Sequence, residues 1–109
     1  MAMQVIRVVQ GNVQCQCFRG KGGNWVAVCE PLKIAVQAET WSDLMEDFGL
    51  TLDAILKDLL GSNELEKFLR DRGWQLSGTI PQRTENVRFD VPFIPAMTHS
   101  YGSQRELPQ

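Results

Sequence analysis

The sequence predicts an α+β fold, with strands in the first and last thirds of the chain and helices between them. Two runs near the N-terminus, Met3 to Val9 and Val13 to Arg19, are rich in β-branched residues or alternate apolar with polar side chains, as strands do. Apolar residues between positions 41 and 60 instead recur every three or four positions, which is the spacing of an amphipathic helix. Alternation returns over Val87 to Phe93.

Length and composition place the chain in an ordinary globular class. Its 109 residues are the usual size of one domain, and we expect a single domain over residues 1–95 with a polar tail over 96–109. A hydrophobic content of 43% and a charged content of 22% exclude a disordered tail or a collagen-like fibre. The net charge of -2 gives no overall positive field, so direct nucleic-acid binding is not expected.

Targeting segments are also not expected. No run approaches the roughly 20 apolar residues of a membrane span, and the first residues carry too short an apolar run for a secretory signal. We therefore expect a cytoplasmic protein with reduced thiols and no membrane partner.

Glycine and proline separate the predicted strands. Gly11-Asn12 follows the first run, either as a tight turn or as a bulge within one long strand. The segment Gly20-Lys21-Gly22-Gly23 predicts a hairpin turn, because glycine accepts a positive φ. A strand over Asn24 to Cys29 follows, Glu30-Pro31 breaks the ladder, and Ile34 to Ala38 forms a third strand.

The hairpin register decides which side chains are buried. A four-residue loop pairs Phe18 with Trp25 and Cys17 with Val26. On that register Cys29 lies on the face opposite the core, although a bulge would exchange the faces. The expected buried face consists of Val13, Cys15, Cys17, Val26 and Val28.

The helix pattern is the clearest in the sequence. Thr40 is a natural N-cap, and Asp43 and Glu46 place negative charge near the positive end of the helix dipole. Gly61 is expected to end the helix in a left-handed conformation. The apolar stripe consists of Trp41, Leu44, Met45, Phe48, Leu52, Ile55, Leu56, Leu59 and Leu60.

A second, shorter helix and further strands complete the predicted fold. The helix is expected over Ser62 to Arg72, with Gly73 as its stop. A strand over Trp74 to Ile80 and another over Val87 to Phe93 follow. Because Pro92 and Pro95 offer no N–H, the latter is expected at a sheet edge or lent to another chain. The candidate oligomer-interface residues are therefore Val87, Phe89, Val91 and Phe93.

No catalytic, metal or cofactor site is expected. His99 lies in the polar tail without a catalytic or metal motif around it. Cys15 and Cys17 point the same way from one strand, but nothing nearby lowers a thiol pKa, so they are read as packing residues. The glycine turn precedes a strand and not a helix, which argues against a phosphate cradle.

Charge and tryptophan supply the candidate binding surface. Five acidic residues of the first helix form either a solvated face or a docking face for a basic partner. Trp25, Trp41 and Trp74 each lie near the edge of an element, where a large ring covers a core or anchors a partner. A weaker basic cluster, Lys67, Arg70, Arg72 and Arg83, surrounds the second helix. The acidic residues are Asp43, Glu46, Asp47, Asp53 and Asp58.

The segment GNWVAVCEPLKIAVQAETWSDLMEDFGLTLDAIL resembles the HicB-like antitoxin family. That family has a glycine turn, an aromatic and small apolar residues, then a proline bend, a short strand, a Thr cap and a long helix. The resemblance covers Val13 to Leu60, about half of the chain. Its positions are occupied here by Gly23, Trp25, Ala27, Pro31, Leu32, Ala38, Thr40, Leu44 and Leu52.

The resemblance implies a partial ribonuclease H-like β-β-β-α core without ribonuclease activity. It implies a protein that binds and neutralises a small basic mRNA-cleaving toxin, and that assembles as a dimer or larger homo-oligomer. We expect partner contacts from Trp25, Trp41, Asp43, Glu46 and Asp47, with Phe89 as a further anchor. No enzymatic activity and no cofactor are implied.

The chain also departs from the family pattern. Lys33-Ile34 replaces the glycine-cysteine pair that commonly follows the proline bend, and no clear repressor module follows the helices. Two alternatives therefore stand beside the antitoxin: a self-associating module without a toxin, and a small metal-dependent nuclease. The nuclease needs clustered carboxylates, whereas Val13 to Arg19 contains no Asp or Glu.

Overall fold

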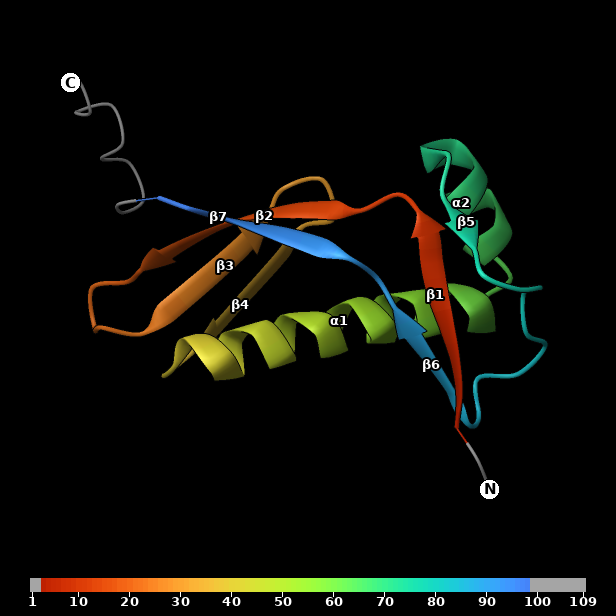
Figure 1. The fold of residues 1–109 in the computed structure, drawn as a ribbon, viewed down its shortest axis with the longest axis horizontal. Coiled ribbons are helices and arrows are strands. Elements are labelled where there is room, and N and C mark those ends of the chain that lie inside the picture. Colours follow the sequence, from red (N-terminus) through yellow and green to blue (C-terminus); the bar gives the residue numbers. More distant parts are fainter. Residues whose placement is uncertain (1–2, 99–109) are drawn as a thin grey trace. The chain divides into compact units, whose positions relative to one another are not determined.

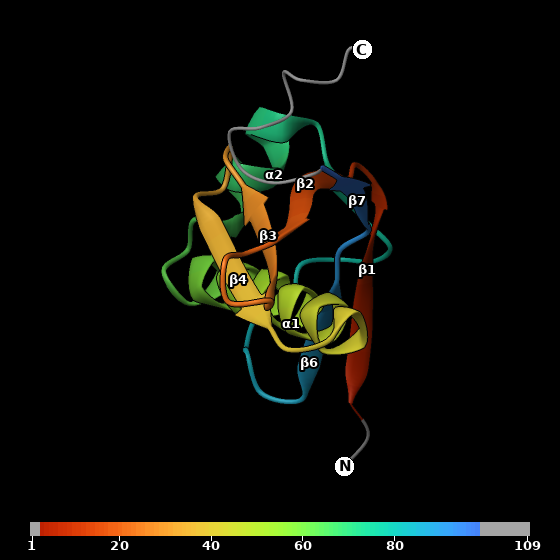
Figure 2. The ribbon, with the colours of Figure 1, turned by 90° about the vertical axis from the view of Figure 1, so that its left-hand side faces the viewer.

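The computed structural model describes residues 3–98, which form an α+β arrangement of seven strands and two helices (Figures 1 and 2). The α+β class expected from the sequence is confirmed. The described residues divide into two compact units. We call residues 14–48 and 93–98 the four-stranded unit, and residues 3–13 and 49–92 the three-stranded unit, after their sheets.

The four-stranded unit is built on the strand order β4-β3-β2-β7. Its strands β2, β3 and β4 pair antiparallel, as the two predicted turns require. The bounds are β2 (Val13–Arg19), β3 (Trp25–Cys29), β4 (Ile34–Ala38) and β7 (Phe93–Met97). The last strand thus continues into the segment that was expected to be a tail.

The predicted hairpin register is wrong by one residue. Phe18 pairs with Val26 and Cys17 with Ala27, because Asn24 belongs to the loop and its carbonyl accepts from the Gly20 N–H at 2.8 Å. A slip of one residue exchanges the faces of β3. Ala27 and Cys29 are therefore buried, while Val26 and Val28 are only half-buried.

Helix α1 (Trp41–Gly61) begins where the sequence predicts. The Thr40 hydroxyl accepts a hydrogen bond from the Asp43 N–H at 3.1 Å, which confirms the N-cap. The apolar stripe faces inward: Leu44, Phe48, Leu52 and Leu56 are fully buried. In the four-stranded unit, Phe48 packs against Phe93 with ring centroids 4.9 Å apart.

The end of α1 differs from the prediction. Asn63, and not Gly61, takes the left-handed conformation, with φ 63°. The N–H groups of Glu64 and Asn63 then bond back to the carbonyls of Leu59 and Leu60, at 2.8 and 3.2 Å. This closing motif occupies residues 62–64, so the second helix begins at Leu65 instead of Ser62.

Helix α2 (Leu65–Arg72) ends as the sequence predicts. Gly73 has φ 69°, and its N–H bonds to the Arg70 carbonyl, which confirms the predicted stop. Leu65 and Leu69 are buried.

The three-stranded unit has the strand order β5-β1-β6. Strand β1 (Gln4–Gln10) runs antiparallel to β5 (Gln75–Leu76) and parallel to β6 (Val87–Asp90). Strand β5 is shorter than the predicted 74–80 segment. Because β1 and β2 belong to different sheets, Gly11-Asn12 is neither a hairpin turn nor a bulge within one strand.

The predicted strand from Val87 to Phe93 is in fact two strands. Pro92 has no N–H for a ladder, and it separates β6 from β7, which lie in different sheets. Both strands lie at sheet edges, as the prolines predicted. The alternation itself is reproduced, because Val87, Phe89 and Val91 are buried.

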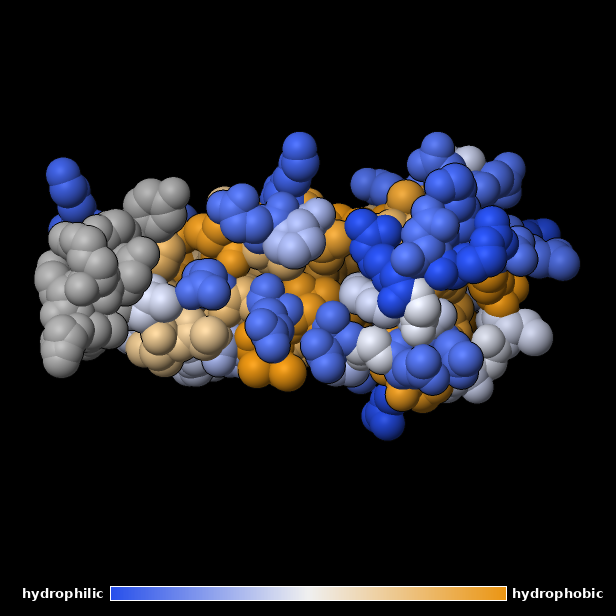
Figure 3. Space-filling view, turned by 90° about the horizontal axis from the view of Figure 1, so that it is seen from above, coloured by the Kyte–Doolittle hydropathy of each residue, from blue (hydrophilic) through white to orange (hydrophobic). Residues whose placement is uncertain are grey.

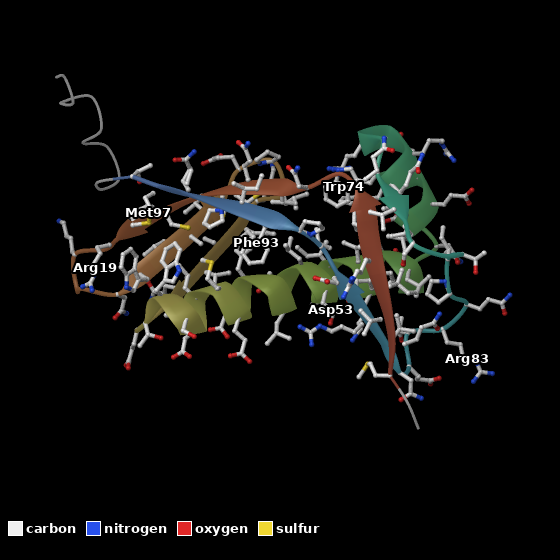
Figure 4. All side chains as sticks on the ribbon, viewed as in Figure 1. Arg19, Asp53, Trp74, Arg83, Phe93 and Met97 are labelled. Atoms are coloured by element: carbon white, nitrogen blue, oxygen red, sulfur yellow. The ribbon has the colours of Figure 1, made fainter. Side chains whose placement is uncertain are left out.

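Asp53 is the buried charge of the three-stranded unit. Its carboxylate, 6% exposed, accepts the Phe89 N–H at 2.7 Å and lies 3.1 Å from the Lys57 ammonium. Asn86 directs its carbonyl toward β1, since it accepts from Gln4. By strand alternation the N–H of Phe89 points to the opposite, free edge of β6, where Asp53 covers it (Figure 4). The prediction that Asp53 belongs to a solvated acidic face is therefore wrong.

Replacing Asp53 tests this arrangement. Asp53→Ala leaves the buried Phe89 N–H without an acceptor, and we expect it to lower the free energy of unfolding by about 2–3 kcal/mol in urea titrations. Asp53→Asn keeps an acceptor for the Phe89 N–H and should lower the free energy of unfolding by less than Asp53→Ala does. The matched control is Asp58→Ala, an exposed residue of the same helix. Equal losses for Asp53→Ala and Asp58→Ala would contradict the assigned role.

Gly11 gives a second stability prediction. It has φ 116°, and a Cβ placed there would overlap the indole of Trp74. We expect Gly11→Ala to lower the free energy of unfolding by about 3 kcal/mol, because strain and overlap add. Gly22→Ala, where a Cβ meets nothing within 4 Å, is the control and should change it by no more than about 0.5 kcal/mol.

Candidate partner-binding surface

Trp25 and Trp41 meet at one end of the four-stranded unit. Their ring centroids lie 5.1 Å apart with an interplanar angle of 74°, an edge-to-face arrangement that stabilises aromatic pairs. The Thr40 cap fixes where α1 starts, and the hairpin places Trp25 opposite Arg19. The Arg19 guanidinium carbon lies 4.8 Å from the centroid of the Trp25 ring, at the hairpin end of the sheet (Figure 4).

The three predicted steering carboxylates lie on a different side of the helix. Asp43, Glu46 and Asp47 are exposed. The neighbouring apolar residues Leu44 and Phe48 are fully buried. At about 100° per residue this spacing puts the carboxylates on the outer face of α1. Figure 4 shows oxygen-tipped side chains projecting from that side of the first turns. The structure therefore joins the two tryptophans but does not join them with the carboxylates.

The predicted basic cluster is largely engaged within the three-stranded unit. Lys67 bonds to Asp71 at 2.8 Å, and this hydrogen bond lowers the pKa of the Asp71 carboxyl. The Arg72 guanidinium lies 3.8 Å from the centroid of the Phe68 ring. Arg83 pairs with Glu85 at 3.7 Å.

Trp74, the third candidate tryptophan, is likewise an intramolecular packing residue. Its ring meets Phe68 edge-to-face at 5.6 Å, next to the left-handed Gly73.

The predicted oligomer-interface side chains face inward. Val87, Phe89 and Val91 are at most 4% exposed, and Phe93 is half-buried. A partner at these strands would meet their backbone edges or their other side chains. On β7 those are Ile94 and Met97, which are 48% and 60% exposed. Figure 3 shows apolar surface exposed between polar side chains in one view of the structure.

Three thiols share the buried face of the four-stranded sheet. Cys15, Cys17 and Cys29 are all buried and free, and the sulfurs of Cys15 and Cys17 are 3.8 Å apart. Burial, with a smaller contribution from the charge of Cys17, raises the pKa of Cys15 to about 12. Burial also raises the pKa of Cys17. Neutral thiols of this kind act as small apolar side chains.

A shallow groove in the three-stranded unit offers little chemistry. It encloses about 510 Å³, and Glu66 is the one ionisable residue among those lining it. The other lining residues are Leu60, Asn63, Leu65, Ile80, Pro81 and Gln82. Across residues 3–98, no group of three or more His, Cys, Asp or Glu side chains is placed to hold a metal ion. His99 lies outside the described residues.

Sequence reasoning missed two features of the structure. Arg19 was not singled out, although its place before the glycine turn puts it beside the first residue of β3. The burial of Asp53 was also missed, because β6 comes from a distant part of the chain.

Comparison of the chain with protein families, with curated proteins and with solved structures found no match. Between residues 3 and 98, neither helix combines the length and apolar character needed to cross a membrane.

The cysteine environment predicts a pH dependence. An unfolded thiol loses its proton near pH 9.0, whereas folded Cys15 holds it until about pH 12. The stabilisation is therefore complete below pH 9 and is lost as the pH rises toward 12. We expect the free energy of unfolding to fall over this interval, and to fall less steeply in Cys15→Ala, as measured by urea titration at each pH.

The same thiols should be unreactive in the folded protein. We expect iodoacetamide to modify Cys15, Cys17 and Cys29 slowly at pH 8 and rapidly in urea, as followed by mass spectrometry. Fast modification of the folded protein would show that this face of the sheet opens readily.

Proposed function

We propose that the protein is a non-enzymatic binding protein of the HicB-like antitoxin type, which binds and neutralises a small basic mRNA-cleaving toxin. The observation that carries this proposal is the element order β2-β3-β4-α1, three antiparallel strands followed by a capped helix. This is the order of the partial ribonuclease H-like core that the resemblance implies.

Local backbone geometry supports the resemblance at three positions: the glycine turn, the helix cap and the proline bend. Gly23 has φ 89° in the hairpin turn, and the Thr40 hydroxyl caps α1. The proline bend closes through a hydrogen bond from the Lys33 N–H to the Glu30 carbonyl at 3.0 Å.

The backbone conformation of Lys33 supports the resemblance, although the residue type departs from the family pattern. It stands where the family commonly has glycine, and its φ is 56°, in the left-handed region that glycine accepts most readily. The bend thus keeps the conformation that a glycine would favour, although the residue type differs.

The acidic face suggests how such a protein would recognise a basic partner. Asp43, Glu46 and Asp47 lie within two turns on the outer face of α1, where they are exposed. Complementary potentials of this kind accelerate encounter and suppress wrong partners. Trp25 and Trp41 pack on each other, so we assign them the role of holding the start of α1 against the sheet, which leaves the acidic face turned outward.

The first test is affinity capture of the tagged full chain from a lysate of its native host, with mass-spectrometric identification. The proposal expects one small, basic, stoichiometric protein that cleaves RNA when alone and is inhibited by this chain. Capture of the chain with only further copies of itself would contradict it and favour the self-associating module.

Charge reversal tests the acidic face once that partner is in hand. We expect the triple variant Asp43→Lys, Glu46→Lys, Asp47→Lys to slow association by about tenfold or more at low salt, with the difference shrinking as salt is added. The control reverses Glu30, Glu64 and Glu66, which are exposed, lie outside α1 and change the net charge equally. Equal association rates for the two triple variants would remove the proposed role of this face.

A further inference from the structure

We propose that strand β4 pairs with β4 of a second copy of the chain, in antiparallel register about a two-fold axis at Val36. The inference concerns the outer edge of the four-stranded sheet, where β4 is the last strand (Figure 2). It does not rest on the proposed function, because it uses only the edges of the sheets and the charges beside them.

The other strand edges of the described chain are interrupted or very short. Strand β5 has two residues. On β6, the free-edge N–H of Phe89 is occupied by the buried Asp53 carboxylate at 2.7 Å. On β7, the Thr98 N–H bonds to Cys17 of β2, so alternation turns the Pro95 nitrogen toward the free edge, where it offers no donor. Proline and inward-reaching charges are devices that prevent edge pairing.

Strand β4 has none of these devices. Its sequence, Ile34–Ala38, contains no charge and no proline, and within the described part of the chain it pairs on one side only, with β3. Five uncharged residues with a free row of N–H and C=O groups form a template for another strand.

Charges at the two ends of β4 identify the second strand. Antiparallel pairing centred on Val36 brings Lys33, the residue before β4, next to Glu39, the residue after β4 of the second copy, and the reverse contact follows by symmetry. Both side chains are exposed, and within residues 3–98 neither belongs to an ion pair. Moving the centre by one residue in either direction loses both pairs. The strand is therefore complementary to itself in one register.

This pairing also matches the faces of the two sheets. Directly opposed residues of antiparallel strands project to the same face, so the buried face of one sheet continues into the buried face of the other. Val36 meets Val36 of the second copy, and Ala35 meets Gln37 of the second copy. The result is an isologous dimer in which two four-stranded sheets become one.

The test is sedimentation equilibrium of the full chain over a wide range of concentration. The wild type should dimerise. Lys33→Glu alone and Glu39→Lys alone should each raise the dimer dissociation constant by about tenfold, since each turns two attractive pairs into repulsive ones. The double variant exchanges the charges and should return it to within about twofold of the wild type.

Edge variants complete the design. Ala35→Lys with Gln37→Lys places lysines opposite each other along the edge and should give a monomer. Ile94→Lys with Met97→Lys, on the exposed part of β7, should leave the dimer unchanged. Circular dichroism melting checks that each variant is folded. A wild type that stays monomeric, or a dimer that resists the β4 variants and is lost with the β7 variants, would overturn the proposal.

Discussion

The hydrogen bond from Phe89 to the buried carboxylate of Asp53 is the interaction on which the three-stranded unit depends. Among residues 3–98, strand β6 pairs only with β1, so the N–H groups of its other edge need acceptors that the sheet does not supply. Asp53 supplies one at 2.7 Å, and Lys57, one turn further along α1, balances the charge at 3.1 Å. A buried carboxylate is tolerated only with such partners. The pair thus fixes which side of the second half of α1 faces β6.

Features set by neighbouring residues were predictable from the sequence. The Thr40 cap, the Gly73 stop and the bounds of β2 depend on local backbone chemistry and on side-chain period. The hairpin register was not predictable in the same way, because it depends on whether Asn24 joins the loop or the ladder. The separation of β6 from β7 was not predictable either, because the local sequence does not show that the strands before and after Pro92 belong to different sheets.

The features of the candidate surface also differ in whether local sequence or contacts between distant elements determine them. The exposure of Asp43, Glu46 and Asp47 follows from the helical period alone. Asp53 was grouped with these residues as one acidic face of the helix, whereas its carboxylate is buried and accepts a hydrogen bond from β6. The contact between Trp25 and Trp41 also joins separate elements, so the helical period and the strand alternation could not reveal it.

Apolar alternation and availability for pairing are different properties of a strand. The alternating side chains of Val87, Phe89 and Val91 are buried in their own unit, so the alternation marks the inside face of that unit. Availability depends on the backbone edge, which Asp53 occupies on β6 and Pro95 interrupts on β7. Strand β4 is open, and its length is set by the bend that places Lys33 before it and the cap that places Glu39 after it. The turns that fold the chain thereby also space the two charges symmetrically about Val36.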